Sequence, residues 1–217
     1  MKKRKSNAEE LLVKEEPIKT EEDSAKVVIE HKADTSAAIF NSGDEWPFEG
    51  LCEQLCLDLF SPYWEVRHGS ALAIREIVKV QGSGAGKITG QSRESNDKRH
   101  SEWLADLSIR LLCVLALDKF TDFVGDQAVV PVRETCAQAL GVVSRFVSEE
   151  LCSNIIDQGL LKLIAESKVS AEAFGWGVRL AALIGLKYIL AVRSDLTSVL
   201  LVKKGAFSDA LNVITDG

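Results

Sequence analysis

One pattern occurs three times in this chain of 217 residues, at 64–80, 131–147 and 176–192. Each copy has a Val-Arg pair near its start, followed by small or apolar residues four, eight and eleven positions after the valine. The pairs are Val66-Arg67, Val132-Arg133 and Val178-Arg179, and the residues that follow are Ser70, Ile74 and Ile77; Cys136, Leu140 and Val143; and Ala182, Leu186 and Ile189. These offsets lie on one stripe of an α-helix. A helix repeated with the same stripe predicts stacked units that bury their apolar faces against their neighbours.

The spacing of the copies fits helix-pair repeats. Val132 and Val178 are 46 residues apart, and HEAT or armadillo repeats are about 40 to 47 residues long. Val66 and Val132 are 66 residues apart, an excess of 20. Residues 81–100 number 20 and are rich in Gly, Ser and charge, so we predict a flexible surface insertion there.

We therefore expect an all-α, HEAT- or armadillo-like solenoid over residues 46–217, with three helix pairs. The pairs are predicted at 48–60 with 64–80, 102–119 with 130–147, and 149–166 with 175–192. Gly159 is expected to interrupt the fifth of these helices. The amphipathic segment 196–214 has no partner before the chain ends, so we expect an unpaired last helix and a longer array.

Residues 1–45 differ from the rest in composition. They contain eight Lys or Arg against eleven Asp or Glu and no sustained apolar stripe. Such a segment buries too little apolar surface to offset its ordering entropy, so we expect a disordered, acidic tail or linker. Within it, Lys2, Lys3, Arg4 and Lys5 form a basic run typical of nuclear import signals, which predicts a nuclear protein.

The composition excludes several classes of function. The chain is 46% hydrophobic and carries a formal net charge of −6, which argues against a surface that binds duplex DNA and favours a basic partner. No uncharged apolar run approaches the ~20 residues that cross a bilayer, so no membrane is expected. The five cysteines lack zinc-site spacing and are interpreted as reduced core residues.

No catalytic motif emerges from the chain. The Gly-rich run 81–88 has Gln81 and Ile88 where a phosphate-binding loop needs Gly and Ser or Thr, which excludes a nucleotide site of that type. The three histidines, His31, His68 and His100, share no ligand or triad spacing. We therefore expect no enzyme activity, cofactor, metal or small-molecule substrate for this chain.

The repeated arginines Arg67, Arg133 and Arg179 allow two interpretations. They could form a functional ladder along the array, or they could bind backbone carbonyls or acidic groups at the joints between repeats. The structural role is favoured, because stacking places equivalent residues at equivalent joints.

Longer phrases resemble a known family. Residues 46–49, 64–69, 110–114 and 131–138 are similar to the amino-terminal HEAT array of the TATA-binding-protein-associated ATPase family, the modifier-of-transcription branch of the Swi/Snf group. The resemblance covers about residues 46–193 and implies a helical array that grips TATA-binding protein. It also implies a carboxy-terminal motor, absent here, that uses ATP and magnesium, contacts DNA and strips that partner from promoters. In that family an acidic insertion can lie in the partner's DNA-binding groove, a role that residues 9–45 could take.

The resemblance directs attention to the turns between paired helices, near 61–64, 122–130 and 173–176. The candidate partner-binding residues are Tyr63, Trp64, Glu65, Arg67, His68, Asp122, Asp126 and Trp176. The aromatic residues among them could instead pack between repeats. The alternative to this family function is a generic HEAT scaffold of a nuclear or cytoplasmic complex.

Overall fold

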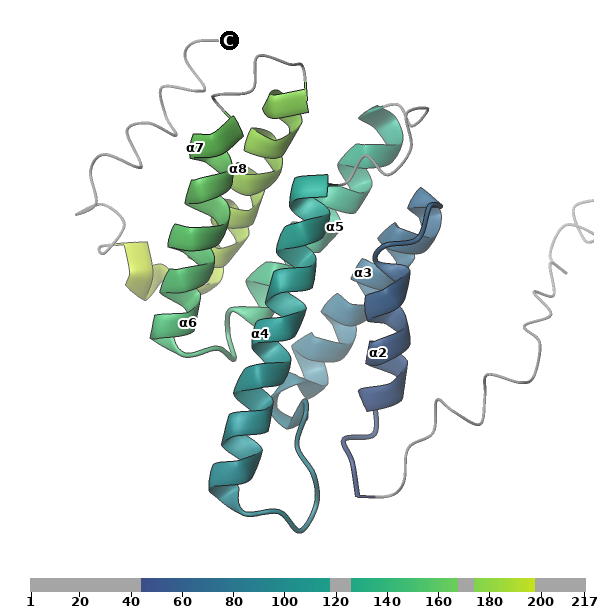
Figure 1. The fold of residues 1–217 in the computed structure, drawn as a ribbon, viewed down its shortest axis with the longest axis vertical. Helices are drawn as coiled ribbons and strands as arrows, with labels where there is room; N and C mark the ends of the chain where they lie inside the picture. The colour runs from purple at the N-terminus through teal and green to yellow at the C-terminus, as the bar shows by residue number, and fades with distance from the viewer. Residues whose placement is uncertain (1–43, 118–125, 168–173, 198–217) are drawn as a thin grey trace, which may run out of the picture. The chain divides into compact units, whose positions relative to one another are not determined.

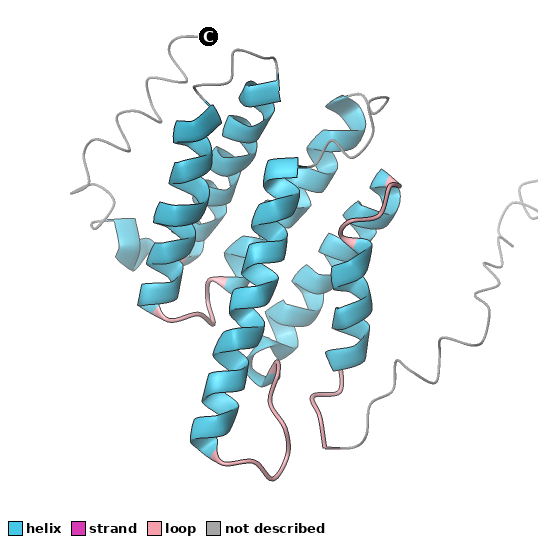
Figure 2. Cartoon of the chain, viewed as in Figure 1, coloured by secondary structure: helices cyan, strands magenta, loops and turns pink. Residues whose placement is uncertain are grey.

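The computed structural model describes residues 44–117, 126–167 and 174–197. These residues are mainly helical, and none of them lies in a strand longer than the isolated bridge between Glu45 and Ile88 (Figure 2). The helices are α2 (Glu49–Asp58), α3 (Trp64–Gln81), α4 (Arg93–Leu117), α5 (Asp126–Val143), α6 (Glu149–Asn154), α7 (Lys162–Ser167) and α8 (Phe174–Val192), with short helical turns η3 (Gly82–Gly84), η4 (Ile155–Leu161) and η5 (Ser194–Leu196). The predicted all-α fold class is confirmed.

The helices pack as stacked pairs. Helix α2 packs against α3, α4 against α5, and α7 against α8. Helices α3, α5 and α8 also contact one another in that order, and Figure 1 shows them as a row behind α2, α4 and α7. The amino-terminal ends of α3, α5 and α8 all lie at the upper end of the array in this view. This arrangement is that of a helix-pair solenoid.

The repeated stripe supplies the core. Eight of the nine stripe residues are buried: Ser70, Ile74, Cys136, Leu140, Val143, Ala182, Leu186 and Ile189. The ninth, Ile77, is half-buried and packs beside Trp46 and Ala85. Apolar residues of α4 fill the space between neighbouring pairs, with Leu107 and Leu111 almost fully enclosed. Each pair thus covers the apolar face of the next, as the repeated pattern predicts.

Residues 81–100 differ from the predicted flexible insertion. Helix α4 begins at Arg93, and not near residue 102, so the second half of this segment is helical. The Asn96 side chain accepts from the Ile88 backbone N–H at 2.8 Å and donates to the Ile88 carbonyl at 3.0 Å. His100 Nδ1 lies 2.8 Å from the Ala85 carbonyl oxygen. The loop prediction is wrong here because the polar residues form the solvated turns of a helix that binds the preceding backbone.

The Gly-rich run is explained by close packing of aromatic rings. A Cβ on Gly82 would lie 2.8 Å from a ring carbon of Phe146, and one on Gly84 would lie 3.0 Å from a ring carbon of Trp46. Gly86 has a positive φ of 69°, which disfavours residues with a side chain. The glycines therefore have a structural role in seating the first helix pair.

Two further helix boundaries differ from the sequence prediction. Helix α5 begins at Asp126 and contains Pro131 in its interior, where the sequence predicted a start at residue 130. The helix of 149–166 is interrupted by the π-turn η4 around Gly159, whose absent Cβ would lie 2.8 Å from a Leu112 methyl group. The predicted tail at 1–45 and the predicted last helix at 196–214 fall almost wholly outside the described residues.

Candidate partner-binding edge

Exposed apolar side chains gather at one edge of the array. We define the turn edge as the C-terminal ends of α2 and α4 together with the N-terminal ends of α3, α5 and α8. Seven of the eleven large apolar residues that the described part of the chain exposes lie there: Leu57, Phe60, Tyr63, Val66, Leu117, Val130 and Trp176. Exposed aromatic and aliphatic groups that recur along one edge are typical of an interaction surface.

Tyr63 and Trp176 are the most exposed aromatic residues of this edge. Tyr63 is 69% exposed and immediately precedes α3, and its backbone N–H donates to the Ser61 hydroxyl at 3.2 Å. Trp176 is 59% exposed in the first turn of α8. Glu65 is also exposed. Three of the predicted contact residues are therefore open to a partner.

Trp64 is half-buried and has a packing role. Its ring packs against the core, and its centroid lies 6.4 Å from that of the His68 ring. The alternative that aromatic residues pack inside the array thus describes Trp64, whereas Tyr63 and Trp176 point outward.

Arg67 is fully buried, which contradicts its assignment as a partner contact. Its Nη1 donates to the carbonyl oxygens of Ser61 at 2.8 Å and Pro62 at 3.2 Å. These carbonyls belong to the turn between α2 and α3. Arg67 therefore closes the turn of its own helix pair, since a buried guanidinium needs several acceptors.

Arg133 and Arg179, the equivalent arginines of the second and third copies, differ from Arg67 in how far they are buried. Arg133 is 4% exposed, and a Cβ on Gly177 would lie 2.6 Å from its Nη2, so this guanidinium lies against α8 at the joint with the next pair. Arg179 is half-buried. The three arginines thus occupy equivalent helix positions with different surroundings.

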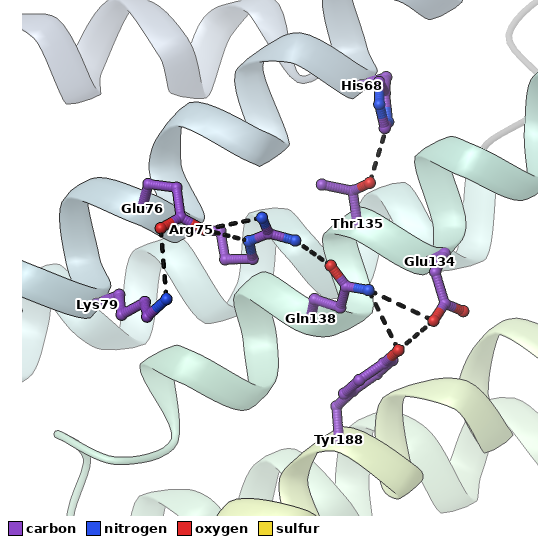
Figure 3. Close-up of polar contacts among 8 residues, drawn as sticks. All are labelled: His68, Arg75, Glu76, Lys79, Glu134, Thr135, Gln138 and Tyr188. Atoms are coloured by element: carbon purple, nitrogen blue, oxygen red, sulfur yellow. Dashed lines mark hydrogen bonds and ion pairs between the residues drawn. The ribbon is translucent and has the colours of Figure 1, made fainter.

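His68 is held inside the joint between the first two pairs. Its Nδ1 lies 3.0 Å from the Thr135 hydroxyl (Figure 3). The same nitrogen lies 3.2 Å from the Pro131 carbonyl oxygen. The Thr135 hydroxyl donates to the same Pro131 carbonyl at 2.8 Å. His68 is half-buried there and links α3 to α5, so its role as a partner contact is not supported.

The remaining predicted residues receive no structural account. Asp126 is the first residue of α5, and its side chain is not among those described. Asp122 and the basic run Lys2, Lys3, Arg4 and Lys5 lie outside the described residues.

A chain of polar side chains crosses the row of α3, α5 and α8, and the sequence analysis did not anticipate it. We call it the polar ladder; it consists of Arg75, Glu76, Lys79, Glu134, Gln138 and Tyr188 (Figure 3). Arg75 donates to the Gln138 side-chain oxygen, and the Gln138 amide donates to the Tyr188 hydroxyl at 3.2 Å. The Tyr188 hydroxyl donates to Glu134. The ladder ties three helices together, and its residues show only ordinary helical spacing in the sequence.

The cysteines have the character of core residues. All five are free, and four are buried, with Cys113 half-buried. Burial raises the pKa of Cys52 to about 12 and that of Cys56 to about 11. Because the thiolate is the reactive form, both thiols are poor nucleophiles near neutral pH.

Two classes of site are not found among the described residues. No group of three or more His, Cys, Asp or Glu side chains within them could hold a metal ion. No helix in this part of the chain is both long and apolar enough to cross a bilayer.

Comparison with known proteins gives consistent relatives, although no family model matches the chain. TATA-binding protein-associated factor 172 of Homo sapiens is 48% identical over 179 residues, which cover 82% of this chain and 9% of the human protein. TATA-binding protein-associated factor mot1 is 45% identical in an Aspergillus fumigatus strain, over 70% of this chain, and 36% identical in Schizosaccharomyces pombe, over 80%. The chain spans 8% and 9% of the length of these two relatives. On this evidence the chain belongs to the family of TATA-binding protein-associated factors, matching one segment of them.

Proposed function

We propose that this helical array is a protein-binding scaffold of a nuclear transcription regulator and that its partner is TATA-binding protein. The observation that carries the proposal is the turn edge, which exposes Tyr63 and Trp176 on a chain whose relatives are named for association with that protein. In a longer protein of this family, the ATP- and magnesium-dependent action on DNA would belong to a motor outside this chain. The helical array would bind TATA-binding protein.

The turn edge has the chemistry of a binding surface. Tyr and Trp are enriched among the residues that dominate interface energies, because each buries a large area while losing few rotatable bonds. Tyr63 and Trp176 stand on the first and third helix pairs, so a partner that touches both would span the array. The net charge of −6 favours a basic partner and accelerates its approach.

A generic scaffold of a multiprotein complex is the second candidate. It would use the same fold and the same exposed edge with a different partner. The family names favour TATA-binding protein, and a binding measurement separates the two candidates.

The test is a titration of fluorescently labelled TATA-binding protein with the whole 217-residue chain, with and without TATA-box DNA. We expect saturable binding that the DNA opposes. Tyr63→Ala and Trp176→Ala should each weaken binding by about tenfold or more, the range of interface hot spots. Val80→Ala is the matched control, because Val80 is 70% exposed but lies near the opposite end of α3.

Each outcome has a clear meaning. Absence of binding would remove TATA-binding protein as the partner and leave the generic scaffold. Binding that both aromatic variants preserve would show that the partner uses another face of the array.

A further inference from the structure

A groove on the row of α3, α5 and α8 has no role in the proposal above. We call it the row groove. It is lined by the C-terminal halves of the three helices: Arg75, Glu76 and Lys79 of α3; Gln138, Gly141 and Val142 of α5; and Tyr188 and Val192 of α8. The turn edge lies at the N-terminal ends of the same three helices, so the two surfaces are separate.

The floor of the row groove is apolar. Gly141 and Val142 of α5 lie between long side chains of α3 and α8, and Gly141 has no side chain that could fill the space above it. Val142 is half-buried, and Val192 is 40% exposed although it is apolar. An apolar group that covered these two valines would remove their surface from water, which is favourable.

Hydrogen bonds already order part of the wall. Arg75 donates to the Gln138 side-chain oxygen, and the Gln138 amide donates to the Tyr188 hydroxyl at 3.2 Å (Figure 3). These bonds join lining residues of α3, α5 and α8, and they hold the side chains in place before a partner arrives. A surface ordered in this way loses less side-chain entropy on binding.

The size of the row groove selects the kind of occupant. Its volume is about 260 Å³, whereas pockets for drug-sized molecules and cofactors have about 300 to 1,000 Å³. One large side chain of a partner polypeptide fits this space better than a cofactor. Because the floor is apolar, that side chain should be apolar.

On the α3 side of the groove, two cations share one carboxylate. Arg75 Nη2 lies 2.8 Å from Glu76 Oε1, and Lys79 Nζ lies 3.6 Å from Glu76 Oε2 (Figure 3). The Lys79 side chain is 55% exposed. Since one negative charge balances only one positive charge, this side of the groove keeps an excess of one positive charge.

On the α8 side, one cation and one carboxylate are present. Lys187 is exposed, and its Nζ lies 4.7 Å from the centre of the Tyr188 ring. Glu134 accepts a hydrogen bond from the Tyr188 hydroxyl. Over both sides, three cations and two carboxylates leave one positive charge, whereas the whole chain carries a net charge of −6. The row groove is thus a locally basic site on an acidic chain.

We propose that the row groove receives a large aliphatic side chain of a partner polypeptide, from a segment in which acidic residues flank that side chain. The aliphatic group would cover Val142 and Val192, and the flanking carboxylates would lie near Lys79 and Lys187. Acidic flanks are favoured over basic ones because the excess charge beside the apolar floor is positive. The inference does not depend on TATA-binding protein or on the turn edge.

The experiment is a nuclear magnetic resonance titration of the isotope-labelled whole chain with the capped peptide acetyl-Gly-Asp-Leu-Asp-Gly-amide. The methyl groups of Val142 and Val192 report on the groove. A second peptide has asparagine in place of both aspartates, which keeps the shape and removes the charge. A third peptide has alanine in place of leucine, which keeps the charge and removes most of the apolar group.

We expect the first peptide to shift the methyl signals of Val142 and Val192 saturably, and each of the other two to bind at least about threefold more weakly. Lys79→Gln should raise the dissociation constant of the first peptide about three- to fivefold, as the loss of a partly exposed ion pair predicts. Lys162→Gln is the matched control and should leave it unchanged. Lys162 is 57% exposed and also lies near a glutamate one turn away, but it belongs to α7 and does not line the groove.

Three results would overturn the inference. Signals of Val142 and Val192 that do not respond to the first peptide would show that the groove is no binding site for it. Equal weakening by Lys79→Gln and Lys162→Gln would assign the binding to the overall charge of the chain. Equal affinity for the asparagine peptide would refute the selection of acidic flanks, and equal affinity for the alanine peptide would refute the role of the apolar floor.

Discussion

Replacing Gly141 with alanine tests how closely α5 and α8 approach each other. Gly141 lies in the buried face of α5, and a Cβ there would lie 2.9 Å from both the Cβ and the carbonyl oxygen of Tyr188. Such distances are shorter than van der Waals contact, and one of the atoms belongs to the backbone of α8. Since a backbone cannot rotate away as a side chain can, α8 must shift to admit the methyl group.

Gly69→Ala provides the matched control. Gly69 is an exposed residue inside α3, and a Cβ there would meet no atom within 4 Å. Both substitutions gain helix propensity of up to about 1 kcal/mol. Gly69→Ala should therefore stabilise the chain by about 0.5 to 1 kcal/mol. Gly141→Ala adds an overpacking cost of about 1 to 3 kcal/mol, so it should be less stable than Gly69→Ala by that amount.

Urea unfolding followed by far-ultraviolet circular dichroism measures both effects. The denaturant dependence should be the same in the two variants, so that the midpoints compare stability alone. In thermal unfolding, each 1 kcal/mol corresponds to about 2 to 4 °C for a domain of this size. Equal stabilisation by both alanines would refute the close approach of α5 and α8 and with it the tight stacking of the second and third pairs.

Three further predictions follow from the described contacts. Arg67→Met should destabilise the chain by about 2 to 3 kcal/mol in urea unfolding, because it removes the donor to the Ser61 and Pro62 carbonyls; a change below ~0.5 kcal/mol would contradict the role of Arg67 in closing that turn. Tyr188→Phe should lower the free energy of unfolding by about 1 kcal/mol, because it removes the hydroxyl shared by Glu134 and Gln138. A double-mutant cycle with Gln138→Ala measures the coupling between the two residues. If the effects of the two substitutions simply add, Tyr188 and Gln138 are not coupled. The pKa of Cys52 is raised from 9.0 to about 12 in the folded chain, so the unfolded chain loses this proton first and the free energy of unfolding falls as pH rises above about 9. Cys52→Ala should make that decline shallower as pH rises from about 9 toward 12. Parallel pH profiles of the two proteins would show that this thiol does not contribute.

The fold could be predicted because the repeated stripe is a local property. Ile74, Leu140 and Leu186 recur at one offset from the Val-Arg pair, and one buried face per helix is enough to require stacking. Polar composition predicted the local structure less well than the repeated stripe did. Residues 93–100 carry so much charge that they were predicted as a loop, yet their Asn96 and His100 side chains bind the preceding backbone while the charged groups face water.

The candidate site was predictable only in part. Tyr63 and Trp176 stand next to helix starts, so their place at a turn follows from the chain itself. The sequence around Arg67 and His68 does not distinguish these two residues from exposed ones. Only the packing shows that Arg67 is enclosed by the turn of its own helix pair and that His68 is held against the next pair. Exposure depends on which element covers a side chain, and that element is distant in the sequence.

The amino-acid sequence by itself determined the helical repeats, their number within the described array and the family to which the chain belongs, because periodicity and shared phrases are properties of order along the chain. Tertiary structure alone decided the polar ladder, the close approach of Gly141 to Tyr188 and the contact of His68 with Thr135. These features join residues from different helices, and their distances depend on how the helices rotate and approach when they pack. The periodicity of a helix is present in its own residues, whereas the residues that it contacts on other helices depend on how the helices pack.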